Sequence, residues 1–479
     1  MDALEKRNSK WIYIILAVFS VISIGPYKLM DEYYIYIAAY MWFGVSYGMC
    51  LQYGRFCFAS AFRDLFAVKV PRMVVGIMVA MVFFSIIGAF ASTMNASAFH
   101  AAPFGFHSTI AGLLFGIGMT LAGGCASGSL YKIGEGNGVS VIVVLSLSVT
   151  QAVFVKMGGW TNNLMPQSWR DKAAQATWIP AKVNVTDGWV DQYLAGHVWP
   201  KPAIQVAELP WAREKFGAAR FFIGDSLINT IIPAALVLVV VYIFWARKNY
   251  HNKMRAEGRP VGGLGAELAG YWGMIMSSKR TAIAGLVLGI SAGLHMFVMK
   301  KLQLAFGVHN FGELMQRMGI TYGLSAKGTV FDPGYWYVTT QEAQWVGWVF
   351  QRLGIDMMDN IYFGLANGVP NPLFNPADWM SLGLIGGACM MALYQKEFKF
   401  KKPTKELAMW AILGGFFMGL GSRLALGCNV GAFFVRISMG DPSGWMFGIG
   451  MVGGAFIGVR FFNWWTERKM AKEMAAFDF

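Results

Sequence analysis

The sequence predicts an all-α polytopic membrane protein, in which two inverted repeats contribute broken helices that meet near the bilayer midplane. Three observations support this fold class: apolar stretches about one bilayer long, basic residues gathered between them, and a glycine-rich segment with a cysteine that occurs twice. The composition agrees, because 56% of the 479 residues are hydrophobic and only 14% are charged. Soluble domains carry about a quarter charged residues. Lipid is therefore the predicted solvent.

Ten hydrophobic segments are predicted to form helices. A helix needs about 20 apolar residues to cross a hydrocarbon core about 30 Å thick, and the strands of β-barrels are much shorter. A basic flank precedes the first segment, but no small-residue cleavage site follows, so this segment is expected to stay as a first span. The segments cover 11–30, 34–52, 73–95, 108–124, 139–157, 221–246, 281–298, 378–395, 407–424 and 443–460.

Basic residues form five clusters between these segments. Placing all five in the cytoplasm satisfies the positive-inside rule and makes both termini cytoplasmic. The formal net charge of +14 does not indicate nucleic-acid binding, because the basic residues lie in separate loops rather than on one folded face. The clusters are Lys6 to Lys10, Arg55 to Arg72, Arg247 to Arg280, Lys396 to Lys405 and Arg460 to Lys472.

Two long polar insertions, about 158–220 and 325–376, are predicted to lie outside the membrane on the opposite side. Both are rich in tryptophan, which gathers at membrane interfaces. The preferred interpretation is a pair of folded loops anchored at the interface, and the alternative is a lid or a docking surface. The tryptophans are Trp160, Trp169, Trp178, Trp189, Trp199 and Trp211 in the first insertion and Trp336, Trp345 and Trp348 in the second.

An internal repeat is the strongest signal in the sequence. Gly112 to Gly128 aligns without a gap on Gly415 to Gly431, and the cysteine match is informative because the chain has only five cysteines. With the predicted topology the two copies run in opposite directions, so repeat one covers about 34–157 and repeat two about 281–460 of a single transmembrane domain, 1–479. The matched pairs are Gly112/Gly415, Gly116/Gly419, Gly118/Gly421, Leu121/Leu424, Gly124/Gly427, Cys125/Cys428 and Gly128/Gly431.

The end of each copy predicts a broken helix. Glycines four residues apart let helix backbones approach closely, so helix packing explains the first part of the repeat. It does not explain the small, polar and charged residues that follow each cysteine. Interrupted helices with their N-termini directed at an anion are a common way to build a transport site. The site is therefore predicted between Cys125 and Cys428, supported by Gly124, Gly128, Gly427 and Gly431.

The five cysteines fall into two predicted classes. Cys57 lies in a polar break beside Arg55, so it is predicted as a third site thiol, whereas Cys50 and Cys389 have ordinary apolar surroundings and are predicted to pack. The sequence contains no C-x-x-C pair, which is the motif typical of a disulfide enzyme. Metal binding would need further ligands such as His100, His107 or His309, none of which is near in sequence. No metal or cofactor is expected.

A thiol is a weak, polarisable donor, so thiols along a membrane path favour a soft sulfur or selenium atom over a strongly hydrated anion. Lys132 and Arg436 lie about two turns past the paired cysteines and are predicted to lower the cost of bringing an anion into low dielectric. For Lys132, anchoring at the membrane surface is the alternative explanation.

At GRFCFASAFRD, AGGCASGSLYKIGEGN and LALGCNVGAFF the sequence resembles the YeeE/YedE family of thiosulfate transporters. The resemblance covers about 34–157 and 281–460; the first span, the helix at 221–246 and the tryptophan-rich insertions depart from it. It implies an hourglass-shaped protein of the bacterial inner membrane in which three cysteines pass thiosulfate along by S–H hydrogen bonds. Cys57, Cys125 and Cys428 match those positions. It also implies a small cytoplasmic sulfur-carrier protein as a candidate partner, because some members are associated with one.

The predicted function is non-enzymatic membrane transport of thiosulfate or a related small sulfur anion. No G-x-x-x-x-G-K-[ST] loop is present, so ATP is not expected to drive it directly. The main alternative is a membrane subunit of a sulfur- or selenium-handling complex, and a third is a membrane thiol enzyme. The expected partners are the sulfur anion and the lipid bilayer.

Overall fold

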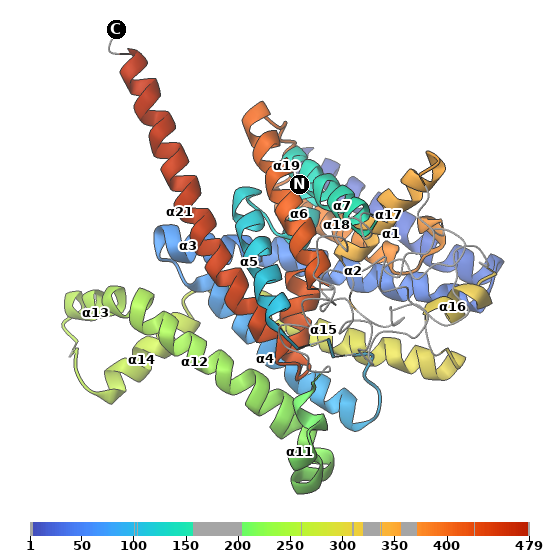
Figure 1. The fold of residues 1–479 in the computed structure, drawn as a ribbon, viewed down its shortest axis with the longest axis horizontal. Coiled ribbons are helices and arrows are strands. Elements are labelled where there is room, and N and C mark those ends of the chain that lie inside the picture. The colour runs from blue at the N-terminus through green and yellow to red at the C-terminus, as the bar shows by residue number, and fades with distance from the viewer. Residues whose placement is uncertain are drawn as a thin grey trace, which may run out of the picture.

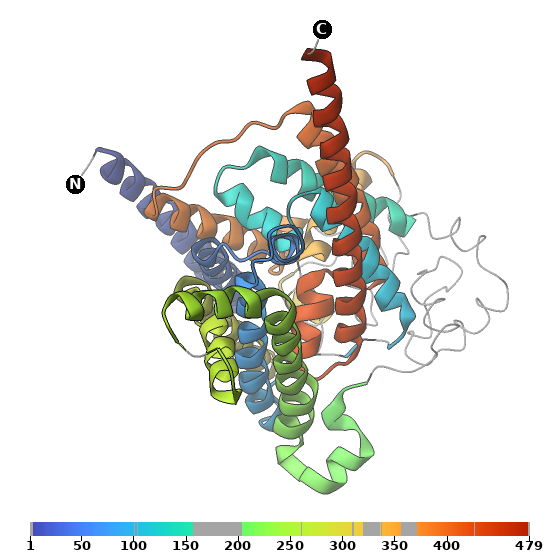
Figure 2. The same cartoon turned by 90° about the vertical axis from the view of Figure 1, so that its left-hand side faces the viewer.

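A computed structural model describes residues 3–99, 101, 102, 104–156, 204–259, 261–308, 311–319, 336, 338–355, 371–425 and 427–477. Within these ranges the chain forms helices and no strand, with one isolated bridge between Asn137 and Lys401. Figures 1 and 2 show the helices crossing in one bundle, from which the C-terminal helix projects. The predicted helical fold class is confirmed.

The first half of the chain alternates long and short helices. Two of the short ones, α3 and α6, follow breaks in the apolar pattern and are too short to cross a bilayer alone. The elements are α1 (Ala3–Leu29), η1 (Glu32–Tyr34), α2 (Ile35–Gly54), α3 (Phe58–Val68), α4 (Arg72–Thr93), α5 (Phe106–Leu121), α6 (Ala126–Gly134) and α7 (Gly138–Lys156).

The chain between the halves forms short helices and one long, nearly continuous helix. After η3 (Val206–Glu208), α11 (Pro210–Phe216) and η4 (Gly217–Ala219), the long helix runs through η5 (Phe221–Ile231), α12 (Ile232–Val241), η6 (Tyr242–Ala246) and α13 (Arg247–Ala256). The second half then contains α14 (Leu264–Ile275), α15 (Lys279–Phe306), α16 (Phe311–Arg317), α17 (Thr339–Arg352), η7 (Pro372–Phe374), α18 (Asp378–Tyr394), α19 (Lys405–Leu424), η8 (Asn429–Val435), α20 (Arg436–Ser438) and α21 (Ser443–Phe477).

All ten predicted hydrophobic segments fall on helices. Eight helical runs are long and apolar enough to cross a membrane, and Gly138–Val153 is a shorter apolar helix. The eight runs are Glu5–Leu29, Glu32–Val68, Arg72–Thr93, Phe106–Gly134, Phe221–Ala256, Lys279–Phe306, Lys405–Leu424 and Ser443–Met474.

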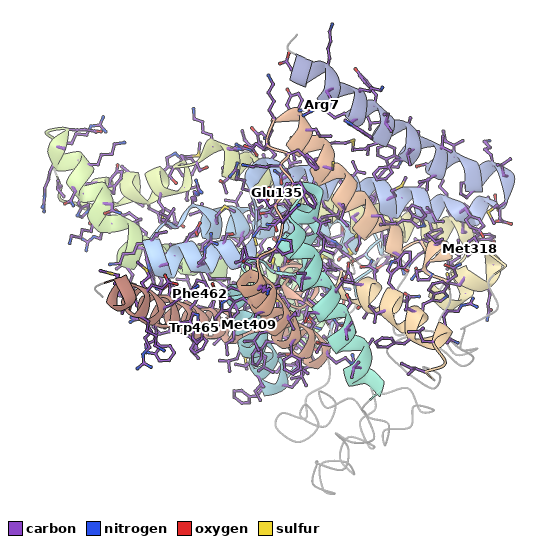
Figure 3. The ribbon with its side chains drawn as sticks, turned by 90° about the horizontal axis from the view of Figure 1, so that it is seen from above. Arg7, Glu135, Met318, Met409, Phe462 and Trp465 are labelled. Atoms are coloured by element: carbon purple, nitrogen blue, oxygen red, sulfur yellow. The ribbon has the colours of Figure 1, made fainter. Side chains whose placement is uncertain are left out.

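Helix α21 is longer than the sequence pattern predicts. Its apolar part continues past residue 460 into a segment whose Phe462 and Trp465 lie beside Met409 at the start of α19 (Figure 3). Trp410 packs edge-on against both rings, at 5.7 and 5.6 Å between centroids. These contacts fix the direction in which α21 leaves the bundle.

Helix contacts in the two halves are reciprocal. Helix α2 packs against α18, while α15 packs against α4; α5 packs against α21, while α19 packs against α7. Helices α5 and α19 also pack against each other in the centre of the molecule (Figure 1). Two repeats of one hairpin would make such contacts, although the inversion itself stays a prediction.

The matched glycines make close helix contacts. A side chain at Gly112 or Gly116 would collide with backbone carbonyls of α21, and one at Gly415 or Gly419 would crowd Ser146 or Thr150 of α7. Glycine at these positions lets the helices approach more closely than any other residue would. The first part of the repeat is therefore a packing feature.

Candidate functional site

Each predicted site cysteine is the N-cap residue of a short helix. Cys57 precedes α3, Cys125 precedes α6, and Cys428 precedes η8, which continues directly into α20; all three have an extended backbone. The first N–H groups of a helix lack intrahelical partners, and the helix dipole makes that end partly positive. The three thiols therefore lie at helix ends that favour an anion.

Cys57 and Cys125 form a close pair of thiols. Their sulfur atoms are 3.8 Å apart, and both side chains are almost completely buried. The backbone N–H of Gly128 donates to Cys125 Sγ at 3.3 Å, and Ser127 Oγ lies 3.7 Å from the same sulfur. Two sequence-distant breaks thus combine into one polar, sulfur-lined point.

Gly128 is required by this pair of sulfurs. A Cβ atom at Gly128 would lie 3.0 Å from Cys125 Sγ and would press against Cys57 Sγ. A Cβ at Gly124 would lie 3.1 Å from Ser129 Oγ. Sequence reasoning missed Gly123, whose φ of +67° favours glycine in the turn before the cysteine.

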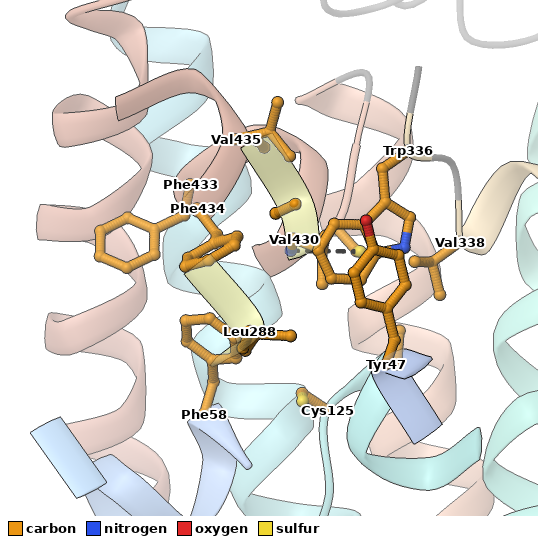
Figure 4. Close-up of a cluster of buried hydrophobic side chains, with 14 of the residues drawn as sticks. Tyr47, Phe58, Cys125, Leu288, Trp336, Val338, Val430, Phe433, Phe434 and Val435 are labelled. Carbon is orange, nitrogen blue, oxygen red and sulfur yellow. Dashed lines mark hydrogen bonds between the residues drawn. The ribbon is translucent and has the colours of Figure 1, made fainter. Parts of the chain in front are cut away.

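Cys428 lies apart from the pair. Its sulfur accepts from the Val430 N–H at 3.4 Å, and the side chain is 2% exposed. A Cβ at Gly427 would lie 3.0 Å from the Ala432 backbone nitrogen, and Gly431 is buried within η8. In Figure 4, apolar side chains including Phe58 and Leu288 occupy the levels between Cys125 and Val430. The structure therefore brings two of the three thiols together and separates the third.

An aromatic cluster fills the space beside Cys428. The Tyr47 and Trp336 rings stack at 3.8 Å between centroids, Trp336 meets the Phe434 ring edge-on at 6.1 Å, and Phe58 lies 6.3 Å from Phe434. All four side chains are buried. We call Tyr47, Phe58, Trp336 and Phe434 the aromatic layer. In Figure 4 the Tyr47 and Trp336 rings lie beside Val430, and the Phe58 ring lies between the levels of Cys125 and Phe434.

Trp336 differs from the interface anchor that its insertion predicts, because it is buried against Tyr47 rather than placed at a surface. Trp211 is 39% exposed, and Trp345 and Trp348 are half-buried on α17. The remaining tryptophans of the first insertion, at positions 160, 169, 178, 189 and 199, lie outside the described residues. The second insertion therefore contributes to the site.

Lys132 and Arg436 make the same kind of contact in the two halves, although Lys132 follows its cysteine by seven residues and Arg436 by eight. Lys132 Nζ donates to the Gly123 carbonyl at 2.5 Å, just past the end of α5, and Arg436 donates to the Ala425 carbonyl at 2.6 Å, at the end of α19. Helix C-termini are partly negative and are stabilised by cations. Each cation therefore offsets the unfavourable helix end that adjoins a cysteine break.

Arg436 is also held by an acidic partner. Its Nε lies 4.0 Å from Asp441 Oδ2, and both side chains are buried. The Asp441 carboxylate in turn accepts from the backbone N–H groups of Ala102 and Ser443, each at 2.8 Å. The Arg436 charge is thus balanced by a carboxylate within the protein.

Arg55 lies at the edge of the site rather than in it. It caps the end of α2 with φ +52°, and its guanidinium is 2.9 Å from Glu397 with a 62% exposed side chain. Glu135, at the end of α6, acts on it as well. The structure therefore places Arg55 in an exposed group of charged side chains with Glu397 and Glu135, two residues before the buried Cys57.

The predicted packing cysteines, Cys50 and Cys389, are both partly exposed and are separate from the site thiols. Of the candidate metal-binding histidines, His107 is buried, while positions 100 and 309 lie outside the described residues. No three side chains of His, Cys, Asp or Glu converge as a metal site in the part of the chain that the structure describes.

Comparison with known proteins gives a consistent result. Residues 53–457 match the Sulphur transport family. The thiosulfate transporter TsuA of Spirochaeta thermophila is 25% identical over 412 residues, covering 84% of this chain and 92% of that protein. TsuA of Escherichia coli is 28% identical over 338 residues, covering 65% and 90%. The probable transporter YedE of Escherichia coli is 34% identical over 142 residues, covering 29% and 34%.

Proposed function

The chain belongs to the Sulphur transport (YeeE/YedE) family, and from this premise we propose that it carries thiosulfate, or a closely related sulfur anion, past Cys57, Cys125 and Cys428. The proposal places it in a bacterial inner membrane with both termini in the cytoplasm. It also takes the two halves as inverted repeats, which the reciprocal helix contacts support.

The observation that carries the proposal is the placement of all three thiols at helix N-termini. An anion there meets backbone N–H groups that have no carbonyl partner within the helix, and the positive end of a helix dipole. Each thiol adds a weak donor that suits a soft terminal sulfur. Weak donors also let the anion leave again, which transport requires as much as binding.

The close pair and the single thiol have different proposed tasks. Cys57 and Cys125, 3.8 Å apart, would hold one sulfur between two S–H groups at the narrowest point, and Cys428 would receive or release the anion on the other side of the aromatic layer. Since every site thiol is buried, the structure represents a closed form. Transport requires the aromatic layer to move.

Lys132 and Arg436 act in this proposal as positioning residues. Each one fixes a helix end beside a break, and Arg436 is already paired with Asp441. They keep the negative ends of α5 and α19 from opposing the anion. Arg55, Glu397 and Glu135 form an exposed group of charged side chains beside the close pair of thiols, where the anion would enter or leave.

The test is uptake of radiolabelled thiosulfate by the purified protein in liposomes, with sulfate, selenite and sulfide as competitors. We expect saturable uptake that unlabelled thiosulfate suppresses and sulfate does not. If there is no uptake and the protein instead co-purifies with other subunits, it is a component of a sulfur- or selenium-handling complex. Turnover of a sulfur compound in detergent would identify a membrane thiol enzyme.

The proposal includes a small sulfur-carrier protein as a partner, and such a protein should bind only from the cytoplasmic side.

A further inference from the structure

Two buried carboxyl groups lie near the single thiol. Glu342 is in the first turn of α17 and 8% exposed, and Asp378 begins α18 and is fully buried. Ser381 Oγ donates to Glu342 Oε1 at 2.6 Å. Asp378 precedes Ser381 by three residues and so lies on the same face of α18, where the Glu342 carboxyl acts on it electrostatically. Glu342 also acts on Cys428.

The group around these carboxyls contains acceptors without donors. Glu342 Oε2, both Asp378 oxygens and Gln341 Oε1 are buried, and no donor among the described residues meets the geometry of a hydrogen bond to them, although the Asn375 amide stabilises the Asp378 carboxylate in part. Gln341 Nε2 donates to the Ala377 carbonyl at 2.8 Å, and the neighbouring Asn375 amide donates to Gln344 at 2.5 Å. A protonated carboxyl supplies an O–H donor that a carboxylate lacks. A proton on one of the two carboxyls would supply the donor that these acceptor oxygens lack.

No cation in the described part of the chain acts on either carboxyl. The Glu342 carboxyl acts on the Cys428 thiol. Helix α2 packs on α18 through Gly44, and its ionisable side chains on either side of that glycine, Tyr40 and Tyr47, both contact the buried His295. Gly134 of α6 packs on α18 at Ile385 and Cys389, which are about two turns or more beyond Asp378, and Lys132 donates to the Gly123 carbonyl. The described residues of α7 and η7 add no charge near the pair.

Two adjacent buried carboxyls without a cation cannot both be ionised, because desolvation and mutual repulsion both oppose it. Burial raises the pKa of the Glu342 carboxyl to about 8, although its bond from Ser381 lowers it in part. The pair therefore retains at least one proton at neutral pH while the protein is closed. It can release that proton only when water reaches it.

We propose that Glu342 and Asp378 form a proton-binding site that is occupied together with the anion at Cys428, so that anion movement is coupled to proton movement. This inference rests on the proposed function. A divalent anion beside a carboxylate is repelled, whereas a protonated carboxyl removes that charge and can donate a hydrogen bond. Linkage makes the effect reciprocal: the proton favours the anion and the anion favours the proton. The proton enters with the anion and leaves on the side where the site next meets water.

The experiment uses the full chain in potassium-buffered liposomes, clamped with valinomycin and loaded with a fluorescent pH indicator. Thiosulfate exchange at equal pH tests the transport function alone. A proton gradient then tests coupling: wild type should acidify the lumen when thiosulfate enters and should accumulate it about tenfold per coupled proton for each pH unit. Glu342→Gln and Asp378→Asn should show exchange that no longer varies with pH, without accumulation. Glu257→Gln, an exposed carboxyl on the α13 end, is the matched control.

The outcomes separate the two claims. Wild type that exchanges no thiosulfate refutes the proposed function, whereas wild type that exchanges it but ignores the proton gradient, or follows a sodium gradient, refutes the coupling. Thermal-shift titrations with thiosulfate give a second readout. The apparent Kd of wild type should rise from pH 6 to pH 9, and that of Glu342→Gln should stay flat. If both variants lose exchange and binding entirely, the pair belongs to the anion path and the coupling proposal is wrong.

Discussion

The two thiol positions begin with the same residues and end with different environments. After Gly-Cys, the first break joins α3 and α6 around two sulfurs 3.8 Å apart, while the second has one sulfur facing aromatic rings and Glu342. The N-cap that precedes α3 is Cys57, and the N-cap that precedes α17 is Val338. Helix α17 packs on α7 as α3 packs on α21. The second half therefore has a carboxyl in the first turn of that helix but no second thiol.

The two matching sequence segments each place a cysteine at a helix end, and the residues around those ends differ; we propose that this difference gives the two positions different tasks. A pair of thiols can enclose one soft atom and hold it, whereas one thiol beside titratable carboxyls can admit or release an anion according to its protonation state.

The largest effect is expected at the close pair. Cys125→Ala and Cys125→Ser should each abolish thiosulfate uptake almost completely, because alanine removes the donor and serine replaces sulfur by a harder oxygen. Cys57→Ala and Cys428→Ala should cause partial to severe loss. Cys389→Ala should cost only packing energy, about 1 kcal/mol. Uptake assays on equal amounts of reconstituted protein distinguish these cases, and a silent Cys125→Ala beside an inactive Cys389→Ala would reverse the assignment.

Nearly as large an effect is expected from one methyl group at Gly128. Gly128→Ala should greatly reduce uptake, because the new Cβ would occupy the space between the Cys57 and Cys125 sulfurs. Gly453→Ala is the matched control, since the nearest atom to its Cβ would be 3.9 Å away in ordinary contact. Size-exclusion profiles should be normal for both variants. Equal uptake by the two alanine variants would show that the sulfurs need not stay close.

A smaller effect on transport and a larger one on stability are expected at the Cys428 side. Arg436→Gln leaves the buried Asp441 without its cation and should destabilise the protein by about 3 to 5 kcal/mol. Arg436→Gln combined with Asp441→Asn should recover much of that loss. Thermal unfolding in detergent measures both. If the single variant unfolds like wild type, the pair does not stabilise this break.

The smallest effect is expected from the first insertion. Shortening 165–200, which lies outside the described residues, should leave uptake largely intact, because the Gln205–Asp225 hydrogen bond of 2.8 Å is retained.

Trp336→Ala in the second insertion should reduce thiosulfate uptake or let thiosulfate leak through the protein, because it removes a ring of the aromatic layer. The same liposome assay compares them. Strong loss on shortening 165–200 with intact folding would instead favour a lid or docking surface.

The helices and the thiol positions could be predicted from the sequence because both depend on local pattern. Apolar length predicts the spans, and a cysteine at a polar break predicts a helix end, as at Cys57, Cys125 and Cys428. The partners of charged residues could not be predicted in this way. Arg436 reads as a free cation in the sequence, but its partner Asp441 becomes effective only when η8 and α20 fold beside it.

The second insertion shows a different limit. Its composition suggested one polar loop, so neither helix α17 nor the burial of Trp336 and Glu342 was predicted. A signal was present in Thr339 to Glu342, where a threonine three residues before a glutamate is typical of a helix start. The burial of Trp336 and Glu342 comes from contacts with Tyr47 and Ser381, which are distant in sequence. Only the folded structure reveals such contacts.

The most direct measurement compares two complementary cysteine sets in the liposome uptake assay. One variant keeps only Cys57, Cys125 and Cys428, with alanine at positions 50 and 389; the other keeps only Cys50 and Cys389, with alanine at the three site positions. We predict that the first transports thiosulfate at close to the wild-type rate and that the second does not transport it at all. Uptake by the second variant at a rate similar to the first would contradict the proposal that three thiols at helix N-termini line the path.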